Sequence, residues 1–523
     1  MFKVKRDRAV LRGIITRTIK LRFRFNVRKR LVVRIKFEET LRMYEISKCC
    51  KMKIRRTCDS ATVAEFVCRR IRVVWIAARS VGQIIHNHRR MTRIGVNDCQ
   101  CNCTESDKPK NEAGHVMFHF SESESIPTPL KNSKNIPVPR RNSGRALMAQ
   151  LNHAFEEFFG STNGGFKRDE LEGCHGPEHF TEGIANEAVM NINHDLPGFV
   201  VAPIDHNQGD TLVRCPQIYG EAMDSMFVRS QGFQVMRIEE KDVIARSKER
   251  YVKEGYNKVA KWNDRGELGK AFIIPEHKDA TRWWPICPSF RESSGRMCKL
   301  IGKAVNHMLW TLPKNSNFNL KRTRELLETV SNTNTKMTTR GIKRGMIGGS
   351  FDIKDMFSKL PHNVILAAVE WVTEYYESNG KNHVRVKKNG KGVTFGKAVG
   401  KVGWQTISMR TIVRFIRYDL QHTFIVAAGK VLRQIVGIPM GKSSSPAIAC
   451  LLCAHYECQF LASLGYDRRL IQGCRLVDDV SIFIVVHTDK NGSLVRATKI
   501  MRRFQQCYHK DLTLVRTDEA ASK

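Results

Sequence analysis

The clearest pattern of apolar and polar positions begins at Met346. Residues 346–353 form a short apolar strand that ends in a carboxylate, Asp352. From Pro361 onward the apolar residues recur at helical spacing until Gly380, a residue type that commonly ends a helix. This segment therefore predicts a strand with a carboxylate at its end, followed by a helix.

A second patterned segment follows further along the chain. Residues 437–441 read Gly-Ile-Pro-Met-Gly, which predicts a tight loop. Ser445 and Pro446 then suit the cap and the first position of a helix, and residues 447–464 continue with helical character. The pattern predicts a Gly- and Pro-containing loop that leads into a helix.

The last pattern is a pair of β-rich runs near the end of the chain. Residues 475–477 and 480–486 are separated only by Asp478 and Asp479. Because Asp suits tight turns, this arrangement predicts a hairpin that presents two carboxylates at its tip.

The first 145 residues have a different character. Residues 1–103 are basic, with little Gly or Pro and weak periodicity. A nucleic-acid-binding arm, an Arg-rich transit peptide and a poorly structured extension without a selected fold all fit this stretch. Residues 104–145 are rich in Ser, Pro, Asn and Lys, which predicts a linker. Globular composition resumes near Ala146 and continues to the end.

The charge of the chain points to its partner. The chain has 88 Lys and Arg residues against 51 Asp and Glu, a net charge of +37. A polyanionic partner such as nucleic acid is the natural interpretation, because neutralised phosphates release counterions. A merely soluble basic surface and binding to an acidic membrane face are the alternatives.

Apolar runs and cysteines bear on the cellular compartment. No run of 18 or more apolar residues is present, so the sequence predicts no membrane span, and no secretory signal is visible. Sixteen irregularly spaced cysteines favour reduced thiols in an intracellular protein. We expect a nuclear or cytoplasmic protein, with organellar targeting by the Arg-rich N-terminus left open.

Two groupings of cysteine could bind metal. The first is Cys99, Cys101 and Cys103, whose spacing is too tight for a CxxC knuckle and which has no second pair close by. The second is a loose grouping between Cys174 and His179. Thiols of ordinary loops are the preferred interpretation of both groupings.

The carboxylates of the patterned segments suggest a catalytic site. Nucleotidyl transfer needs two divalent ions about 3.5–4 Å apart, one lowering the pKa of the attacking 3′-hydroxyl and the other holding the triphosphate. Mg²⁺ takes hard oxygen ligands and keeps several waters, so a few carboxylates suffice. An Asp-Asp turn alone is usually a solvated turn. The order of the three segments in a basic chain, with Asp352 ahead of Asp478 and Asp479, is what favours the site.

These segments resemble reverse transcriptases, the RNA-directed DNA polymerases of mobile elements. Residues 351–357, Phe-Asp-Ile-Lys-Asp-Met-Phe, resemble motif A; residues 437–446 resemble motif B; residues 476–479, Leu-Val-Asp-Asp, resemble motif C. Residues 272–278 and 282–286 resemble the two basic fingers motifs that hold the incoming triphosphate.

A weaker resemblance lies upstream, and together they imply a fold. Residues 200–209, followed by Pro216 and Tyr219, resemble the Asp-Lys-Gly region of Penelope-like elements. The whole resemblance covers roughly residues 195–520. It implies an α+β right-hand polymerase with an antiparallel sheet and packed helices. The implied parts are 146–270, the N-terminal part of the reverse transcriptase region; 271–345, the fingers; and 346–523, the palm with motifs A to D.

The resemblance also implies roles for residues of motifs A and C. Asp352, Asp478 and Asp479 would bind Mg²⁺ or Mn²⁺, and Asp355 would lie near the triphosphate. Phe357 would be the steric gate that excludes a ribose 2′-hydroxyl, where RNA-dependent RNA polymerases carry an Asp. A core aromatic residue is the alternative interpretation of this Phe.

Residues of the fingers and of motif B would contact the substrates. Lys278 and Arg282 would neutralise the triphosphate, one as a point charge and the other as a fork. Gly437, Pro439 and Gly441 would let the template–primer and the nucleotide approach the backbone closely. The partners implied are an RNA template, a nucleic-acid primer and deoxynucleoside triphosphates.

Three positions depart from the family pattern. Leu476 stands where an aromatic residue is usual, Trp284 where Arg is usual, and Glu276 where Lys is usual. The last two weaken triphosphate neutralisation. The chain stops near the end of motif D, so no thumb is expected within it. The main hypothesis is an RNA-directed DNA polymerase, and the alternative is a catalytically inactive remnant that binds RNA or DNA.

Overall fold

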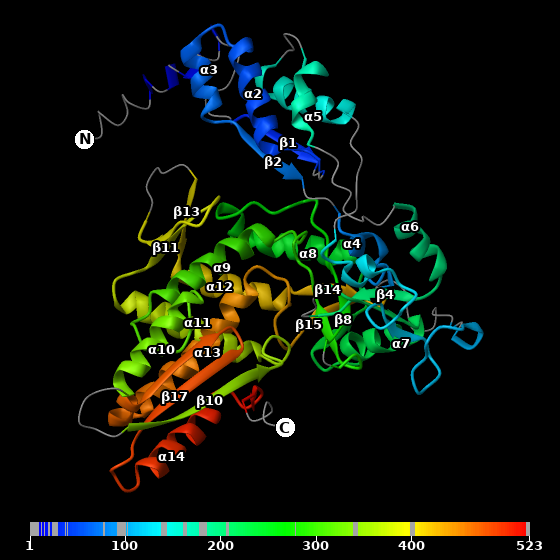
Figure 1. The fold of residues 1–523 in the computed structure, drawn as a ribbon. Coiled ribbons are helices and arrows are strands. Elements are labelled where there is room, and N and C mark those ends of the chain that lie inside the picture. Colours follow the sequence, from blue (N-terminus) through cyan, green and yellow to red (C-terminus); the bar gives the residue numbers. More distant parts are fainter. Residues whose placement is uncertain are drawn as a thin grey trace. The chain divides into compact units, whose positions relative to one another are not determined.

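The computed structural model describes most of the chain between residues 10 and 518. The described residues are 10, 11, 13, 14, 16–18, 21, 22, 30–36, 38, 40–76, 79–91, 101, 103–136, 144–160, 165–176, 186–205, 209–277, 279–337, 344–397 and 403–518. The chain splits into two compact units, Met1–Asn87 with Cys103–Arg214 and His88–Asn102 with Cys215–Lys523. Both mix helices and strands (Figure 1), so the α+β class predicted from the sequence is confirmed.

The first unit contains a pair of parallel strands with helices. β1 (Val32–Lys36) pairs with β2 (Arg72–Ile76), and α2 (Met43–Thr57) and α3 (Ala61–Cys68) connect the two strands. α5 (Gly144–Phe159) packs against β1. Every second residue of β1 is buried while its Arg and Lys face outward, because successive side chains of a strand point to opposite faces. Part of the basic N-terminal segment, whose order the sequence leaves open, is therefore folded.

A three-stranded antiparallel sheet forms the rest of the first unit. Its spatial order is β3 (Met117–His119), β5 (Thr211–Arg214) and β4 (Val200–Pro203). Two helices, α4 (Val81–Ile85) and α6 (Asn186–Asp195), contact each other in this unit.

The segment 104–145 differs from the linker that its composition suggests. It supplies β3 and a short 3₁₀ helix, η4 (Thr128–Asn132), and another, η3 (Cys103–Glu105), begins just before it. Val116, Phe118 and Phe120 alternate along the strand and are buried. These few apolar residues at strand spacing order a Ser- and Pro-rich stretch, because they bury against β5.

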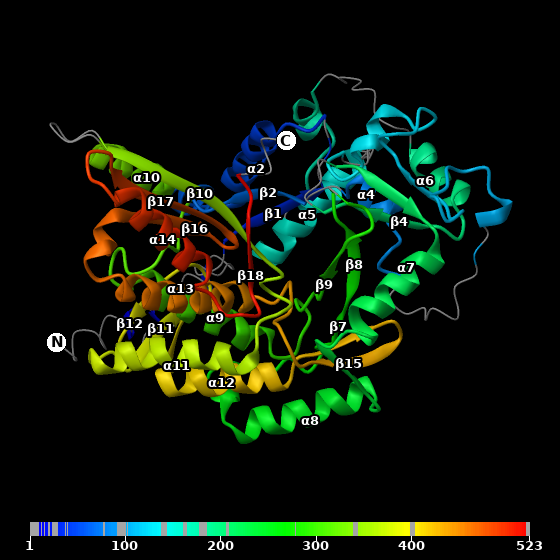
Figure 2. The ribbon, with the colours of Figure 1, turned by 90° about the horizontal axis from the view of Figure 1, so that it is seen from below.

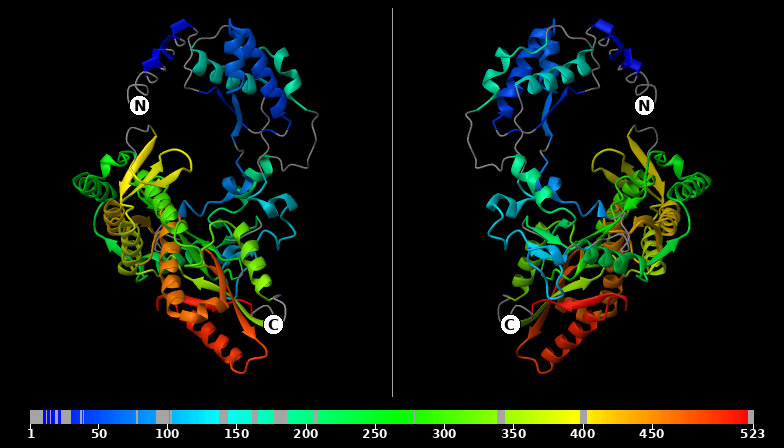
Figure 3. Two further views of the ribbon diagram at one scale, coloured as in Figure 1. Left: turned by 90° about the vertical axis from the view of Figure 1, so that its left-hand side faces the viewer. Right: turned by 90° about the vertical axis from the view of Figure 1, so that its right-hand side faces the viewer.

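A four-stranded antiparallel sheet forms the centre of the second unit. Its spatial order is β16 (Ile471–Leu476), β17 (Asp479–His487), β10 (Arg344–Lys354) and β18 (Thr513–Arg516). One face carries the apolar side chains of the long strands and is covered by helices. Figure 3 shows the C-terminal helix, in orange and red, beside these strands.

Five helices build the core around this sheet. They are α9 (Gly295–Trp310), α11 (His362–Ser378), α12 (Met409–Gln421), α13 (Ser445–Ser463) and α14 (Ser493–Gln505). α13 is apolar on nearly all sides and contacts both α9 and α11, as suits a helix enclosed by its neighbours. The ring of Phe504 on α14 contacts Phe351 of the sheet and Phe460 of α13. Figure 2 shows α11 and α12 side by side.

Three smaller sheets and several helices complete the second unit. The strands, in spatial order within each sheet, are β12 (Val393–Phe395), β11 (His383–Lys387) and β13 (Trp404–Ser408); β6 (Phe233–Met236), β15 (Lys430–Gln434), β14 (Phe424–Ala427) and β7 (Gly269–Lys270); and β8 (Phe272–Pro275) and β9 (Trp283–Ile286). The remaining helices are α7 (Pro216–Met223), α8 (Glu240–Lys253) and α10 (Arg324–Met337), with the short elements η6 (Asp224–Val228), η7 (Tyr256–Lys258) and η8 (Gly465–Leu470). In the first unit the corresponding short element is η5 (Asp169–Cys174). No helix among the described residues is both long and apolar enough to span a membrane.

The predicted elements of the second unit differ from the observed ones mainly at their ends. The strand before the first helix is longer than expected and includes Asp352 and Lys354 within it. The hairpin near the C-terminus has Val477 and Asp478 as its two loop residues, and Asp479 already belongs to β17. The turn therefore lies one residue earlier than the Asp-Asp pattern predicts.

Candidate active site

Asp352 and Asp479 lie directly opposite each other on neighbouring strands. The antiparallel register of β10 and β17 ends with this pair, and directly opposed Cβ atoms in such sheets lie about 4.5–5.5 Å apart. The backbone N–H of Ile353 donates to the carbonyl oxygen of Asp478 at 3.0 Å. The three carboxylate residues singled out in the sequence thus come together at one end of the sheet.

The carboxylates occupy the face of the sheet that the core helices do not cover. Phe351, Ile353 and Val480 are buried in the core, so the alternation of strand side chains directs Asp352 and Asp479 to the opposite face. The side chain of Asp352 is 23% exposed, and Asp479 is exposed. A substrate or an ion can therefore reach them.

Asp352 has a charged partner on its own strand. The ammonium of Lys354, two residues further on and on the same face, lies 2.5 Å from a carboxylate oxygen of Asp352. A divalent ion at Asp352 would compete with this ammonium. The donor set itself, three carboxylates with access to solvent, fits the preference of Mg²⁺ and Mn²⁺ for oxygen ligands.

The turn that carries Asp478 has a strained backbone. Val477 has a φ of 61°, a left-handed conformation that is rare for a β-branched residue. Two-residue hairpin loops usually place Gly, Asn or Asp at positions with positive φ. A conformation of this kind costs on the order of 1–3 kcal/mol and persists only where the surroundings fix it.

A buried ion pair supplies that fixation. Arg475 Nη1 donates to the carbonyl oxygen of Val477 at 2.9 Å. Arg475 Nε lies 2.5 Å from Glu457 Oε1 on α13, and neither side chain has any exposed surface. Arg475 thus connects the strained turn to the helix beneath the sheet.

Further hydrogen bonds complete the surroundings of Glu457. Tyr508 Oη donates to Glu457 Oε1 at 2.8 Å, and the backbone N–H of Phe318 donates to Glu457 Oε2 at 2.8 Å. Burial opposes the charge of Arg475, but the carboxylate of Glu457 outweighs it and raises the pKa of the guanidinium above its ordinary value. Burial, and then the charge of Glu457, raise the pKa of Tyr508.

Sequence reasoning missed this pair, although a signal was present. Glu457 is a lone acidic residue in the otherwise apolar stretch that forms α13, and Arg475 stands in a β-rich run. A charge in a buried element implies a partner, because an unpaired buried charge is too costly.

Asp355 and Phe357 border a cavity next to the carboxylates. Both line a cavity of about 680 Å³ in the second unit, together with Pro439 and Met440. Asp355 is exposed, has a φ of 54° and pairs with Lys359 at 3.0 Å. Phe357 is half-buried and packs partly against the core, so it presents part of its ring to the cavity and part to the interior.

The Gly-Ile-Pro-Met-Gly loop packs directly against the segment that follows Asp352. The N–H of Ile438 donates to the carbonyl oxygen of Phe357 at 2.8 Å. Gly437 has a φ of 79°, and a Cβ there would lie 2.6 Å from the carbonyl oxygens of Phe357 and Ser358. Only glycine fits both the conformation and the close approach.

The other end of the loop contacts the strand of the β8–β9 hairpin. The N–H of Cys287, just after β9, donates to the carbonyl oxygen of Met440 at 2.9 Å. Gly441 has a φ of 116°, and a Cβ there would lie 3.0 Å from the carbonyl oxygen of Cys287. The loop therefore joins the motif A segment on one side and the hairpin on the other.

Lys442 anchors the same loop in the interior. Its ammonium lies 2.8 Å from Asp419 and 3.2 Å from Glu292, and all three side chains are almost fully buried. Burial disfavours the charge of Lys442, but Asp419 and then Glu292 outweigh it and raise its pKa. Burial raises the pKa of Glu292. Sequence reasoning missed this triad because its members come from three distant segments.

The hairpin that resembles the fingers motifs is present as β8 and β9. Arg282 is mostly exposed, with a guanidinium nitrogen 3.9 Å from a carboxylate oxygen of Glu276. Lys278 lies outside the described residues. Tyr219 donates its hydroxyl hydrogen to the carbonyl oxygen of Ile273 at 3.1 Å, which ties α7 to β8.

The two cysteine groupings from the sequence have different surroundings. Cys174 Sγ lies 3.6 Å from Cys49 Sγ in the core of the first unit. Cys103 Sγ accepts a hydrogen bond from a backbone N–H. Cys99 and His179 lie outside the described residues.

Comparison with known proteins gives matches only at the level of structure. No family model matches the chain, and no curated protein matches it in sequence. Apo telomerase from Candida tropicalis is similar at 14% identity and a TM-score of 0.44, over 64% of this chain and 56% of that chain. Telomerase from Candida albicans in complex with a TWJ fragment of telomeric RNA is similar at 12% identity and a TM-score of 0.44, over 76% of this chain and 58% of that chain. This chain therefore spans a little over half the length of either protein.

Proposed function

We propose that this chain is an RNA-directed DNA polymerase that adds deoxynucleotides to the 3′ end of a primer. The observation that carries the proposal is the pairing of Asp352 with Asp479 across β10 and β17, with Asp478 in the adjoining turn. The sequence order of strand, loop and hairpin allowed such a meeting. The register supports it, because both carboxylates project from one accessible face.

Three carboxylates at one sheet end suit a two-metal nucleotidyl transfer. Asp352, Asp478 and Asp479 would hold two Mg²⁺ or Mn²⁺ ions, which lower the pKa of an attacking hydroxyl and stabilise a triphosphate. The chain's own contribution is to keep the carboxylates in place. The β10–β17 ladder fixes two of them, and Arg475 holds the strained turn that carries the third.

The cavity beside the carboxylates is suited to a nucleotide. Phe357 and Asp355 line it from the motif A side, and Pro439 lines it from the loop. We propose that the ring of Phe357 excludes a ribose 2′-hydroxyl, which makes deoxynucleotides the preferred substrates. Gly437 and Gly441 keep the loop close to the neighbouring backbone, so no side chain of theirs intrudes.

The remaining parts fit a right-hand polymerase. We interpret the β16-β17-β10-β18 sheet with α13 and α14 as a palm, and the β8–β9 hairpin as part of the fingers. An RNA template, a nucleic-acid primer and phosphate contacts by the basic surface follow from this interpretation and from the net charge of +37. A mobile-element origin and the Penelope-like type stay predictions.

One observation favours the second candidate, an inactive remnant that only binds nucleic acid. Glu276 lies beside Arg282, so part of the charge that would neutralise a triphosphate has a partner within the protein. An exposed pair at this distance contributes little, about 0–1 kcal/mol. A triphosphate can therefore displace Glu276 as the partner of Arg282.

Primer extension distinguishes the two candidates. The purified chain is incubated with a labelled DNA primer annealed to RNA, one deoxynucleotide at a time, with Mg²⁺ or Mn²⁺. A polymerase adds only the nucleotide complementary to the template, whereas a remnant binds the duplex in a gel-shift assay and leaves the primer unchanged. Template-independent addition would contradict the proposed function, and so would binding without extension in both metals.

A further inference from the structure

Three cysteines and one histidine gather at the start of α7. Cys215 follows β5 directly and precedes the first residue of the helix. The β3–β5 register pairs Met117 with Arg214, so its continuation brings Val116 opposite Cys215. Cys103 Sγ accepts the backbone N–H of Val116 at 3.3 Å. Chain neighbours and strand register thus collect these side chains at the end of a sheet.

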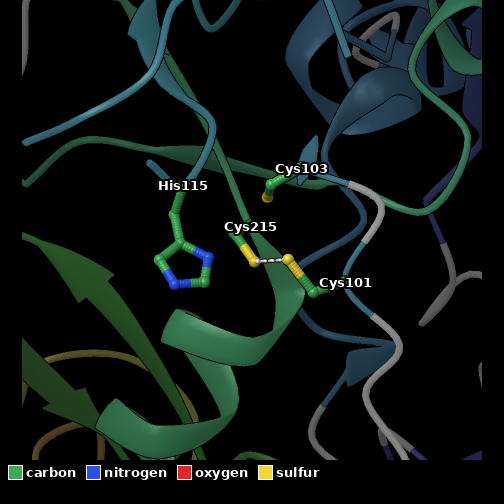
Figure 4. Close-up of side chains that lie close together, drawn as sticks. All are labelled: Cys101, Cys103, His115 and Cys215. Carbon is green, nitrogen blue, oxygen red and sulfur yellow. Dashed lines mark hydrogen bonds between the residues drawn. The ribbon is translucent and has the colours of Figure 1, made fainter. Parts of the chain in front are cut away.

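Their ligand atoms are close enough to share one ion. Three sulfur atoms and one ring nitrogen all lie within 4.8 Å of one another (Figure 4). They belong to Cys101, Cys103, His115 and Cys215. The Sγ atoms of Cys101 and Cys215 are 3.5 Å apart. With Zn–S bonds of about 2.3 Å, sulfurs in a tetrahedral site lie roughly 3.7–3.8 Å apart, so small side-chain rotations complete the geometry.

We propose that these four residues bind one Zn²⁺ ion as a structural Cys₃His site. Thiolate and imidazole are the donors that zinc prefers, and four protein ligands fill its tetrahedral shell. Cys103 and Cys215 are buried, at 2% and 0% exposure, so the ion is shielded from water on their side. The N–H of Val116 stabilises the thiolate of Cys103, as backbone donors around metal ligands commonly do.

The loop that carries Cys103 and His115 is shaped to present both. The backbone N–H of His115 donates to Asn111 Oδ1 at 2.9 Å, and the N–H of Asn111 donates to the carbonyl oxygen of His115 at 2.8 Å. Gly114, with a φ of 79°, makes the turn between them. The zinc ion fastens this loop to the residue that follows β5.

A disulfide between Cys101 and Cys215 is the competing chemistry. It requires the two sulfurs to approach to about 2.05 Å, and it uses neither the third thiol nor the imidazole. Spacing alone favoured loop thiols, because His115 and Cys215 are too far along the sequence to be read with the Cys-x-Cys pair. The convergence of four donors is what favours zinc.

Metal analysis of the full chain tests the site. The protein is expressed with zinc, purified under reducing conditions, dialysed and analysed by inductively coupled plasma mass spectrometry. We expect about one zinc ion per chain. Cys103→Ser and Cys215→Ser should each lower the zinc content roughly tenfold or more, since each removes a ligand. The half-buried thiol of Cys458 lies outside the group, so Cys458→Ser should keep the zinc.

A variant that preserves four ligands guards against misfolding as the explanation. His115→Cys should retain about one zinc ion, and Co²⁺ added to the zinc-free wild-type chain should give thiolate-to-metal absorption of a tetrahedral site. Three results would overturn the proposal: a wild-type chain without zinc, zinc retained in both serine variants, or a Cys101–Cys215 disulfide in peptides from the reduced preparation after mild purification.

Discussion

Arg475 has no exposed surface, yet it carries a positive charge beside Glu457 and holds the turn of Asp478. At the residue scale, buried pairs of this kind are the parts of the site that local sequence patterns do not reveal. Apolar spacing predicts the strand that ends near Asp352, because that information is local. The partner of Arg475 sits on another element, and only the packing of α13 under the sheet brings the two together.

Removing one member of the pair should be costly. Arg475→Met leaves Glu457 buried without its counter-charge, and we expect a loss of about 3–5 kcal/mol in the free energy of unfolding. Urea unfolding followed by circular dichroism measures this loss. The double variant Arg475→Met with Glu457→Leu should regain much of it, because no charge is then left unpaired.

A solvent-exposed pair provides the matched control. Arg417 lies 2.8 Å from Glu370, and their side chains are 52% and 41% exposed. Arg417→Met should change the free energy of unfolding by about 0–1 kcal/mol. Equal losses in Arg475→Met and Arg417→Met would contradict the importance given to burial.

Sugar selection is the other prediction at this scale. If the ring of Phe357 excludes the 2′-hydroxyl, Phe357→Ala should raise ribonucleotide incorporation relative to deoxynucleotide by roughly tenfold or more, about 1.4 kcal/mol in relative transition-state energy. Single-nucleotide kcat/KM values measure the ratio. Phe357→Tyr keeps the ring and should keep the discrimination; an unchanged ratio in an active Phe357→Ala enzyme would show that the ring only packs in the core.

At the scale of elements, the Gly-Ile-Pro-Met-Gly loop connects the parts of the site. Its first glycine meets the backbone after Asp352, and its second meets the backbone after β9. A loop with a helix behind it is predictable from Gly, Pro and the Ser-Pro pair, since their conformational preferences are intrinsic. Which backbone the loop contacts depends on distant segments. The anchoring of Lys442 by Asp419 and Glu292 is equally non-local.

Gly437→Ala should damage both fold and site. The alanine would face a positive φ and a backbone oxygen at 2.6 Å, so we expect a loss of more than about 1 kcal/mol in unfolding free energy and weaker nucleotide binding. Gly380→Ala is the matched control, because Gly380 has a φ of 72° with open space around its Cβ position. It shares the strain without the clash, and equal effects of the two substitutions would rule out the close approach as the cause.

The scale of the whole molecule is where composition informs and misleads. A net charge of +37 indicates a polyanionic partner. The same basic, weakly patterned composition hides the fold of the first unit. There β1 pairs with β2 forty residues later and packs against α5 from beyond the gap at residues 137–143. Contacts over such separations leave little periodic signal in any one segment.

Binding of nucleic acid should depend steeply on salt. If the basic surface neutralises three or more phosphates, affinity for single-stranded RNA should fall roughly tenfold or more between 50 and 200 mM salt. Fluorescence anisotropy with a labelled RNA measures this, and an uncharged peptide nucleic acid of the same sequence serves as the control. A flat salt dependence would exclude phosphate contacts as the source of affinity.

The pairing of Asp352, Asp478 and Asp479 as a metal-binding catalytic centre is tested most directly by one charge-removing substitution. Asp478→Asn changes little volume but removes a metal-binding charge, while Asp489→Asn makes the same change in an exposed turn at the far end of β17. Primer extension on an RNA template, with Mg²⁺ and with Mn²⁺, measures both variants beside the unchanged chain. We expect Asp489→Asn to extend the primer normally and Asp478→Asn to lose extension by at least about a hundredfold, equivalent to roughly 2.7 kcal/mol. Extension that survives Asp478→Asn would show that the catalytic centre lies elsewhere.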